Sequence, residues 1–189
     1  MKPIELVIVA GILGCTFVAS SHAAEDADAE TTKLIAALPN AKISLIKGLA
    51  QATKGSEVPI SAKYEMDDHG KLSLSVYTAE KGLAVEPEKN VLKELSGGPE
   101  QESWNPETEV FKDVEHVGRS SEQLVLNALS HKSLLAIAKD ASARTGGTVF
   151  SVVPTLEDRK PVFVVLVAKD DKISTLTYDI PSGTFLQQK

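Results

Sequence analysis

The residues best suited to chemistry are three of the four histidines, those that follow residue 23, and the acidic residues near them. His69 lies in the segment Asp67-Asp68-His69-Gly70, and His116 and His131 lie further along the chain. A metal centre needs three or four converging ligands. Segment 67–70 has the composition of a tight turn, where acidic side chains point into water. His116 and His131 do not form an H-x-x-x-H pair. We therefore predict a solvated turn, surface or packing histidines, and no bound metal.

Motifs for catalysis are missing from the sequence. It contains no glycine-rich phosphate loop and no nucleophile elbow. Its paired carboxylates fall mainly in turn-like segments, where water keeps their acidity ordinary. We predict a protein that is not an enzyme and has no cofactor. Trp104, the single tryptophan, is expected to anchor its segment against the core rather than to bind a ligand.

The first 23 residues resemble a secretory signal peptide. Lys2 precedes an apolar run over residues 6–19, and Ser21 and Ala23 are small residues at positions −3 and −1 of a cleavage site. The run is shorter than the roughly 20 residues of a membrane-spanning helix. We predict cleavage near Ala23 and a periplasmic or secreted bacterial protein.

Two alternatives to simple cleavage remain open. The leader could stay attached as a membrane anchor. Ile12-Leu13-Gly14-Cys15 resembles a lipobox, in which Cys15 would be lipidated. Leu13 is bulky for that motif, and the apolar run continues past Cys15. Contact with a membrane is expected only through the leader or through a lipid on Cys15.

Length and charge exclude some partners. Removing the first 23 of 189 residues leaves 166, enough for one ordinary domain or two small ones. The net charge is −6 and the chain contains no basic cluster. Binding to nucleic acid needs concentrated lysine and arginine, so we predict no nucleic-acid partner.

The chain divides into five predicted segments: the signal peptide 1–23, an acidic leader with a short helix over 24–42, a first unit over 43–98, a helical connector over 99–129, and a second unit over 130–189. Residues 24–32 are acidic and small and are expected to be mobile. Each unit begins with an amphipathic helix and continues with three strands, as the switch in hydrophobic period indicates. The first helix is capped by Ser44 and the second by Ser130 or Ser133.

This order of elements predicts an α+β fold with two helix-plus-three-stranded antiparallel meander units joined by a helical connector. The segments LAQA (49–52) and LAIA (135–138) place the two helices in register. In the connector, Asn105-Pro106 predicts a helix start, with valines at 110, 114 and 117. Gly118 is expected to end that helix, and Ser120 and Gln123 resemble the capping box of another.

The second unit resembles the PepSY domain. The residues that carry the resemblance are Ser130, Leu135-Ala136-Ile137-Ala138, Gly146-Gly147, the strand 160–167, and the closing D-x-x-[ST]-G motif at 179–183. The first unit has a similar plan but lacks the closing motif. The resemblance implies an exported or envelope protein that restrains a peptidase or mediates protein contacts. It implies no catalytic residues.

One strand departs from the family pattern. Phe163, Val165 and Val167 correspond to the positions that face the helix, whereas Val162, Val164 and Leu166 occupy positions that are often charged in the family. Leaving these three side chains in water is unfavourable, since full burial of each is worth about 1.5–3 kcal/mol. Either the connector or the first unit covers them, or they form an interaction face for another protein.

Two functions follow from these patterns. The first is a non-catalytic protein-interaction module whose partner is an envelope or secreted protein, such as a peptidase, and which uses this strand face or a sheet edge. The alternative is a periplasmic protein that binds a small ligand or a metal in a pocket between the two units.

Overall fold

The computed structural model describes residues 21–170 and 172–189, with side chains from residue 29 onward. The predicted signal peptide therefore lies largely outside the described residues, and Cys15 lies wholly outside them. The α-helices are α1 (Ser21–Ala37), α2 (Leu45–Ala52), α3 (Val114–Ala128) and α4 (Leu134–Thr145), with 3-10 turns at Leu38–Asn40 and Pro87–Lys89. The strands are β1 (Val58–Met66), β2 (Leu72–Ala79), β3 (Leu92–Gly97), β4 (Glu107–Val110), β5 (Thr148–Glu157), β6 (Lys160–Lys169), β7 (Lys172–Asp179) and β8 (Phe185–Gln188).

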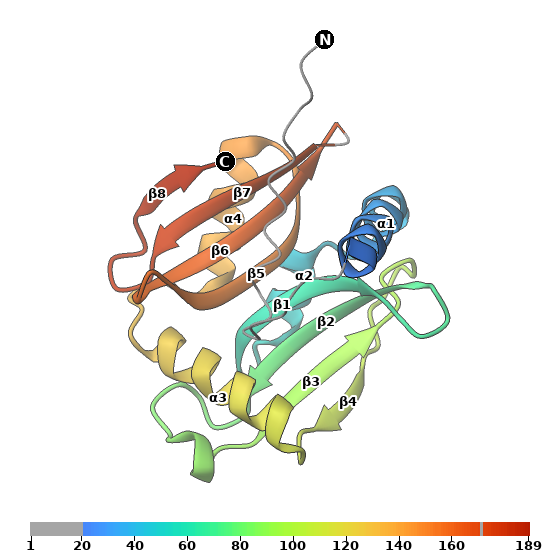
Figure 1. The fold of residues 1–189 in the computed structure, drawn as a ribbon. Coiled ribbons are helices and arrows are strands. Elements are labelled where there is room, and N and C mark those ends of the chain that lie inside the picture. Colours follow the sequence, from blue (N-terminus) through green and yellow to red (C-terminus); the bar gives the residue numbers. More distant parts are fainter. Residues whose placement is uncertain (1–20, 171) are drawn as a thin grey trace.

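All eight strands form one antiparallel sheet in the order β4-β3-β2-β1-β5-β6-β7-β8 (Figure 1). Helix α2 precedes β1–β3 and α4 precedes β5–β7. The two halves meet at the centre of the sheet, where Ala62 pairs with Val152 and Lys63 with Ser151. The predicted α+β class is confirmed. The sheet is continuous across both halves, and strand β8, which follows the D-x-x-[ST]-G motif, adds an edge strand that the sequence analysis does not predict.

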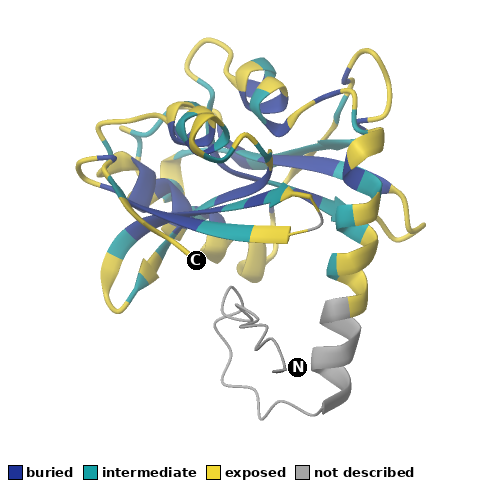
Figure 2. Cartoon of the chain, turned by 90° about the horizontal axis from the view of Figure 1, so that it is seen from above, coloured by how far each residue is buried: buried dark blue, intermediate teal, exposed yellow. Residues whose placement is uncertain are grey.

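The main core lies between the sheet and helices α2 and α4. Val76, Ala62, Val152 and Val165 are successive cross-strand partners, so their side chains share one face. They belong to the same buried cluster as the inward residues of both helices. Figure 2 shows buried residues along the strands and exposed residues on the outer sides of the helices. One core therefore serves both halves of the chain.

Helix α3 lies on the opposite face of the sheet. Ser61 alternates with Ala62 and points away from the main core, and its hydroxyl donates to Oε1 of Gln123 on α3 over 2.6 Å. A register shift between Pro59 and Ser61 accompanies the contact of Ile60 with Leu124 of α3, in a second buried cluster. The connector thus contributes a covering layer to the sheet.

The N-terminal part of the described chain differs from the prediction. Residues 24–32 are expected to be mobile, yet α1 runs through them to Ala37. This segment is rich in alanine, which favours helix, and it contains no glycine or proline before Pro39. The sequence analysis does not predict this helical conformation, and the expected mobility of residues 24–32 stays a prediction. The short helix expected before Pro39 is the end of α1.

The connector is also only partly helical. Residues 107–110 form β4, whose Glu107 to Val110 pair with Ser96 to Lys93 of β3. Asp113 is the N-cap of helix α3, and its side chain accepts from the backbone N–H of His116. The helix continues through Gly118 to Ala128. The predicted helix start at 105–107, the break at Gly118 and the separate second helix are therefore wrong.

The two capping serines also correct the alignment of the helices. Ser44 accepts from Lys47 N and Ser133 accepts from Ala136 N, each over 3.2 Å. The N-cap of α4 is therefore Ser133 and not Ser130. Aligning 49–52 with 135–138 pairs Ser44 with Ser130, which is three residues away from the observed cap. The alignment of the two helices by their LAQA and LAIA segments is therefore wrong by three residues.

The closing D-x-x-[ST]-G motif is a structured turn between β7 and β8. Oδ2 of Asp179 accepts from the backbone N–H of Ser182 over 2.9 Å and from its hydroxyl over 2.5 Å. Gly183 has a φ of +64°, which favours glycine. Lys132 donates from Nζ to the carbonyl oxygen of Gly183 over 2.9 Å. The turn thus connects the sheet edge to the start of α4.

This turn predicts an acid-sensitive part of the stability. The hydrogen bonds from Ser182 lower the pKa of Asp179, so the turn is stabilised above the unfolded-state pKa and loses this contribution as pH falls through the folded-state value. Asp179→Ala is expected to lower the urea midpoint at pH 7, with a difference from the wild type that narrows below about pH 4. Urea titrations at both pH values measure this. Asp68→Ala, in the exposed turn between β1 and β2, is the control and should change the midpoint little at either pH. A difference for Asp179→Ala that does not change with pH contradicts this role.

Candidate interaction surface

The strand face predicted as an interaction surface is covered. Val162 is 3% exposed and Val164 is 4% exposed, while Leu166 is half-buried. Val164 pairs with Val153 of β5 and Thr177 of β7, on the face of the sheet where α3 packs. Of the two alternatives left open for Val162, Val164 and Leu166, cover from within the chain is therefore confirmed for the two valines, and the docking face is wrong for them.

Helix α3 has an unusual distribution of side chains. Its inward side is largely polar: Ser120, Gln123 and Asn127 are buried. Asn127 donates from Nδ2 to the carbonyl oxygen of Ile60 over 2.7 Å. Buried polar groups that find partners in this way are well tolerated. Hydrogen bonds to β1, together with Leu124 and Leu126, therefore hold α3 on the sheet.

The outward side of α3 carries several exposed aliphatic residues beside the charged residues Glu115, Arg119 and Glu122. Val114 is 90% exposed, and Val125 and Leu129 are each 52% exposed. In the described part of the chain, four of the eight exposed large hydrophobic residues lie on α3 or at its C-cap: Val114, Val117, Val125 and Leu129. Single exposed hydrophobic residues are normal on a protein surface, but a contiguous group of them marks an interaction site.

We define the α3 stripe as the outward residues Val114, Gly118, Ser121, Val125 and Ala128. All of them are exposed except Ser121, which is half-buried. Exposed Glu115 and Arg119 beside the stripe form an ion pair over 3.1 Å. The N-terminal end of α3 is fixed where the His116 ring stacks on Phe111 with 5.1 Å between ring centroids. The stripe is therefore an apolar surface on a firmly held helix.

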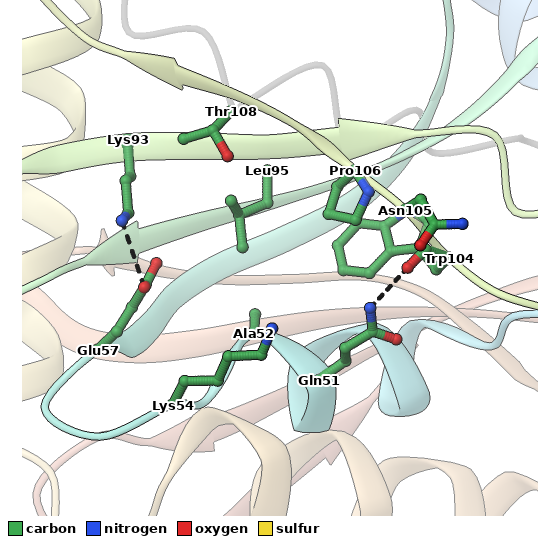
Figure 3. A pocket seen from close by; sticks show the side chains of 10 residues that line it. All are labelled: Gln51, Ala52, Lys54, Glu57, Lys93, Leu95, Trp104, Asn105, Pro106 and Thr108. Carbon is green, nitrogen blue, oxygen red and sulfur yellow. Dashed lines mark hydrogen bonds and ion pairs between the residues drawn. The ribbon is translucent and has the colours of Figure 1, made fainter.

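A polar cavity of about 390 Å³ lies on the other side of the sheet, where β3 and β4 meet the end of α2 (Figure 3). Inside it, Nζ of Lys93 lies 3.3 Å from Oε2 of Glu57 and 3.0 Å from Oε2 of Glu80. The Thr78 hydroxyl donates to the other oxygen of Glu57 over 2.7 Å. Two of the three charged residues that line the cavity, Lys93 and Glu57, are thus already paired with each other.

Trp104 closes one side of this cavity and is 2% exposed. Its backbone carbonyl accepts from Nε2 of Gln51 over 2.6 Å, and its ring lies near Gly48. The prediction that Trp104 anchors its segment against the core is confirmed. A further cavity of about 630 Å³ lies between α1 and the turn that follows β1. Neither of these two cavities lies between the two halves of the chain, where the sequence analysis places a binding pocket.

His69, His116 and His131 lie on three different segments of the chain. His69 is in the turn after β1, where Oδ1 of Asp67 accepts from the backbone N–H groups of His69 and Lys71. His116 contacts Asp113, and His131 is exposed before α4. Within residues 21–170 and 172–189, no group of three or more histidine, cysteine or acidic side chains is arranged to hold a metal ion.

The fold and this surface define an α+β protein with one eight-stranded antiparallel sheet and an apolar helix face open to solvent. No helix in the described part of the chain combines the length and the apolar character needed to cross a membrane. No family model matches the chain, and no curated protein matches it.

The chain is similar to a crystal structure at 1.85 Å resolution of a protein from Clostridium difficile 630 that is described as a "putative lipoprotein". The two share 12% identity over 79% of this chain and 93% of the other, with a TM-score of 0.36. A likeness of this extent carries no argument about function. The PepSY resemblance is untested by these comparisons and stays a prediction.

Proposed function

We propose that this chain is a non-catalytic protein-interaction module of an exported protein, and that the α3 stripe is its contact surface. The observation that supports the proposal is the reversed polarity of α3, whose buried side is largely polar while its valines face water. Each exposed aliphatic side chain that becomes fully buried contributes about 1.5–3 kcal/mol to association. Export and the class of partner, an envelope or secreted protein such as a peptidase, follow from the leader and the PepSY resemblance.

The proposal includes a duplicated unit. We propose that α2 with β1–β3 and α4 with β5–β7 are two copies of one helix-plus-meander unit. The support is the matching order of elements, with a capping serine at the start of each helix and an antiparallel contact between the first strands of the two copies. In this arrangement α3 is the insertion between the copies. It is therefore the part of the chain most free to carry a specific function.

A photo-crosslinking amino acid at position 125 tests the contact surface in cells that express the full chain. We expect covalent adducts with a protein, which mass spectrometry then identifies. The matched control carries the same amino acid at Ile173, an exposed hydrophobic residue on β7 with 43% exposure, and should give no adduct. Absence of any protein adduct from position 125 contradicts the proposed function. An adduct with a peptidase supports the partner class that the PepSY resemblance implies.

The cavity beside Trp104 supports a second candidate function, the binding of a small polar ligand. Gln51, Asn105 and Thr108 supply polar groups at its rim, and pockets with a few convergent polar groups are common ligand sites. A ligand that binds the native state raises the melting temperature. A screen of the full chain with divalent metals and small metabolites tests this candidate. A positive shift that Gln51→Ala abolishes supports it, and unchanged melting throughout counts against it.

A further inference from the structure

Strand β4 leaves one side of its backbone open. Its only neighbour among the described strands is β3 (Figure 1), and all four of its residues are exposed. Phe111, which directly follows β4, donates its backbone N–H to the carbonyl oxygen of Leu92. Hydrogen-bonded pairs alternate along an antiparallel ladder, so Glu107 and Glu109 direct their backbone groups to β3. The backbone N–H and C=O groups at positions 108 and 110 therefore point outward, where an added strand can bind them.

The cavity beside Trp104 opens next to this edge. Thr108 lines the cavity together with its cross-strand partner Leu95 and with Asn105 (Figure 3). The exposed side-chain amide of Asn105 has no hydrogen-bond partner within the described residues. When a strand adds to a sheet edge, backbone hydrogen bonds supply affinity and pockets for alternate side chains supply specificity. The residue of an added strand that stands opposite Thr108 therefore meets the cavity, where Asn105 suits an uncharged polar side chain.

The other face of β4 is acidic. Glu107 and Glu109 are exposed, and none of the ion pairs among the described residues includes either of them. Glu109 lies directly opposite Glu94 of β3, and like charges in such positions are destabilising. Burial, together with the charges of Glu65 and Glu109, raises the pKa of Glu94. A cation bound beside β4 therefore relieves a repulsion between β3 and β4.

These charges argue against a second copy of this chain as the added strand. Antiparallel pairing of β4 with the β4 of another copy sets the glutamates of one copy opposite those of the other, which is unfavourable. The opposite edge of the sheet is β8, and its residues Phe185–Gln188 include no basic side chain. The strand that fits β4 belongs to a different protein and carries a basic residue opposite each glutamate.

From these observations we infer that β4 binds an extended peptide segment of a partner protein, in which two basic residues flank one uncharged residue. This surface is additional to the α3 stripe, and the inference does not rest on the stripe. The basic side chains face Glu107 and Glu109, and the residue between them faces Thr108 and the cavity. The positions opposite the glutamates are the non-hydrogen-bonded pairs of the new ladder, in which side chains lie closest. A short strand with two exposed ion pairs binds weakly, with a Kd of about 0.1–1 mM.

The test titrates the isotope-labelled full chain with a capped peptide of sequence Val-Lys-Gln-Lys-Val and follows the backbone amides by NMR. We expect saturable shifts at Thr108 and Val110 and slower hydrogen exchange of both amides, because carbonyl oxygens of the peptide accept from them. The control peptide Val-Gln-Lys-Lys-Val has the same composition and charge, but its adjacent lysines lie on opposite faces of a strand. It should bind at least about threefold more weakly, since one ion pair is lost.

Two proline variants test the edge itself. Thr108→Pro removes an outward N–H and leaves the ladder between β3 and β4 intact, as proline does on edge strands. We expect it to weaken binding of the Val-Lys-Gln-Lys-Val peptide by at least about tenfold. Gln188→Pro makes the same change on β8, where Lys189 exchanges backbone hydrogen bonds with Thr175 and the N–H of Gln188 points outward. This control should leave peptide binding unchanged.

The two glutamates are tested by neutral replacements of the same shape. Glu107→Gln and Glu109→Gln should each weaken peptide binding by about twofold to fivefold, as expected for one exposed ion pair. Added salt should weaken binding to the wild type more than binding to either variant. Binding that neither replacement changes overturns the assignment of the basic residues to this face.

Equal affinity for the two peptides overturns the inference, because it indicates a general attraction between a basic peptide and an acidic chain. Unchanged binding by a folded Thr108→Pro variant overturns it as well, and so does the absence of saturable shifts up to about 10 mM peptide. If Thr108→Pro does not fold, hydrogen exchange of the wild type decides: exchange at Thr108 and Val110 that the peptide does not slow overturns the inference. Missing photo-adducts at position 125 contradict only the proposed function.

Discussion

Replacing Val164 with glutamate is expected to lower the free energy of unfolding by at least about 4 kcal/mol, because a carboxylate is placed at a position with 4% exposure. Total stabilities of domains are about 5–15 kcal/mol, so this variant should be largely unfolded in mild denaturant. Urea titration followed by circular dichroism and by the fluorescence of Trp104 measures the loss.

Val125→Glu is the matched control, because it makes the same chemical change at a position that is 52% exposed. Its free energy of unfolding should stay within about 0.5 kcal/mol of the wild type when measured at low protein concentration. A loss for Val164→Glu as small as that expected for Val125→Glu would show that Val164 is not in the interior. A stable folded Val164→Glu variant would restore the strand face as a candidate docking surface.

Local patterns predict the greater part of the fold. The alternation of Leu72, Leu74 and Val76 with polar residues predicts β2, and all three side chains are buried on the sheet. The charged turn between β5 and β6 is confirmed as a two-residue connection in which Asp158 and Arg159 both have positive φ. These features depend on neighbouring residues alone, which explains why the sequence contains enough information for them.

The predictions are wrong for features that depend on contacts between residues far apart in the sequence. The valines at 110, 114 and 117 suit a helix, but Val110 pairs with Lys93 of β3 and belongs to a strand. A four-residue edge strand has no periodicity of its own. Gly118 likewise looks like a helix end, whereas α3 continues through it from its cap at Asp113 to Gln123 and Asn127, which form hydrogen bonds with β1.

The candidate interaction surface shows the same limit. The burial of Val162 and Val164 depends on the layer that covers their face of the sheet, and one strand cannot reveal it. The α3 stripe was detectable in part, because Ser120, Gln123 and Asn127 lie at helical spacing opposite the valines. Sequence alone does not say which side of such a helix faces the protein. Only the hydrogen bonds of Gln123 and Asn127 to β1 decide it.

Breaking the ion pair in the cavity beside Trp104 is the other change for which we expect a large loss of stability. Lys93→Met is expected to lower the free energy of unfolding by about 3 kcal/mol, because it leaves Glu57 without its cation. The side chains of Lys93 and Glu57 are only 13% and 16% exposed, so water compensates poorly. The double variant Lys93→Met/Glu57→Gln removes both charges and should recover most of this loss. Urea titrations of the wild type, Lys93→Met, Glu57→Gln and the double variant give the coupling energy between the two residues directly.

Lys42→Met is the control for this cycle, because Lys42 forms an ion pair of similar length, 2.9 Å, with Glu102, in which both side chains are largely exposed. Its replacement should change stability little. A loss for Lys93→Met no larger than for Lys42→Met would show that the pair in the cavity is fully hydrated.

The loss of stability on Lys93→Met should depend on pH in a definite direction. Burial lowers the pKa of Lys93, but hydrogen bonds to Glu80 and Glu57 outweigh burial and raise it overall. A raised pKa in the folded state means that the contribution is complete below the ordinary lysine pKa and is lost as pH rises through the folded-state value. The difference between wild type and Lys93→Met should therefore stay constant from neutral pH to about pH 10 and decrease above it. A lysine held in this way by two carboxylates stabilises the junction of β1, β2 and β3, and is poorly placed to bind an anionic ligand. The cavity is therefore the weaker of the two candidate sites.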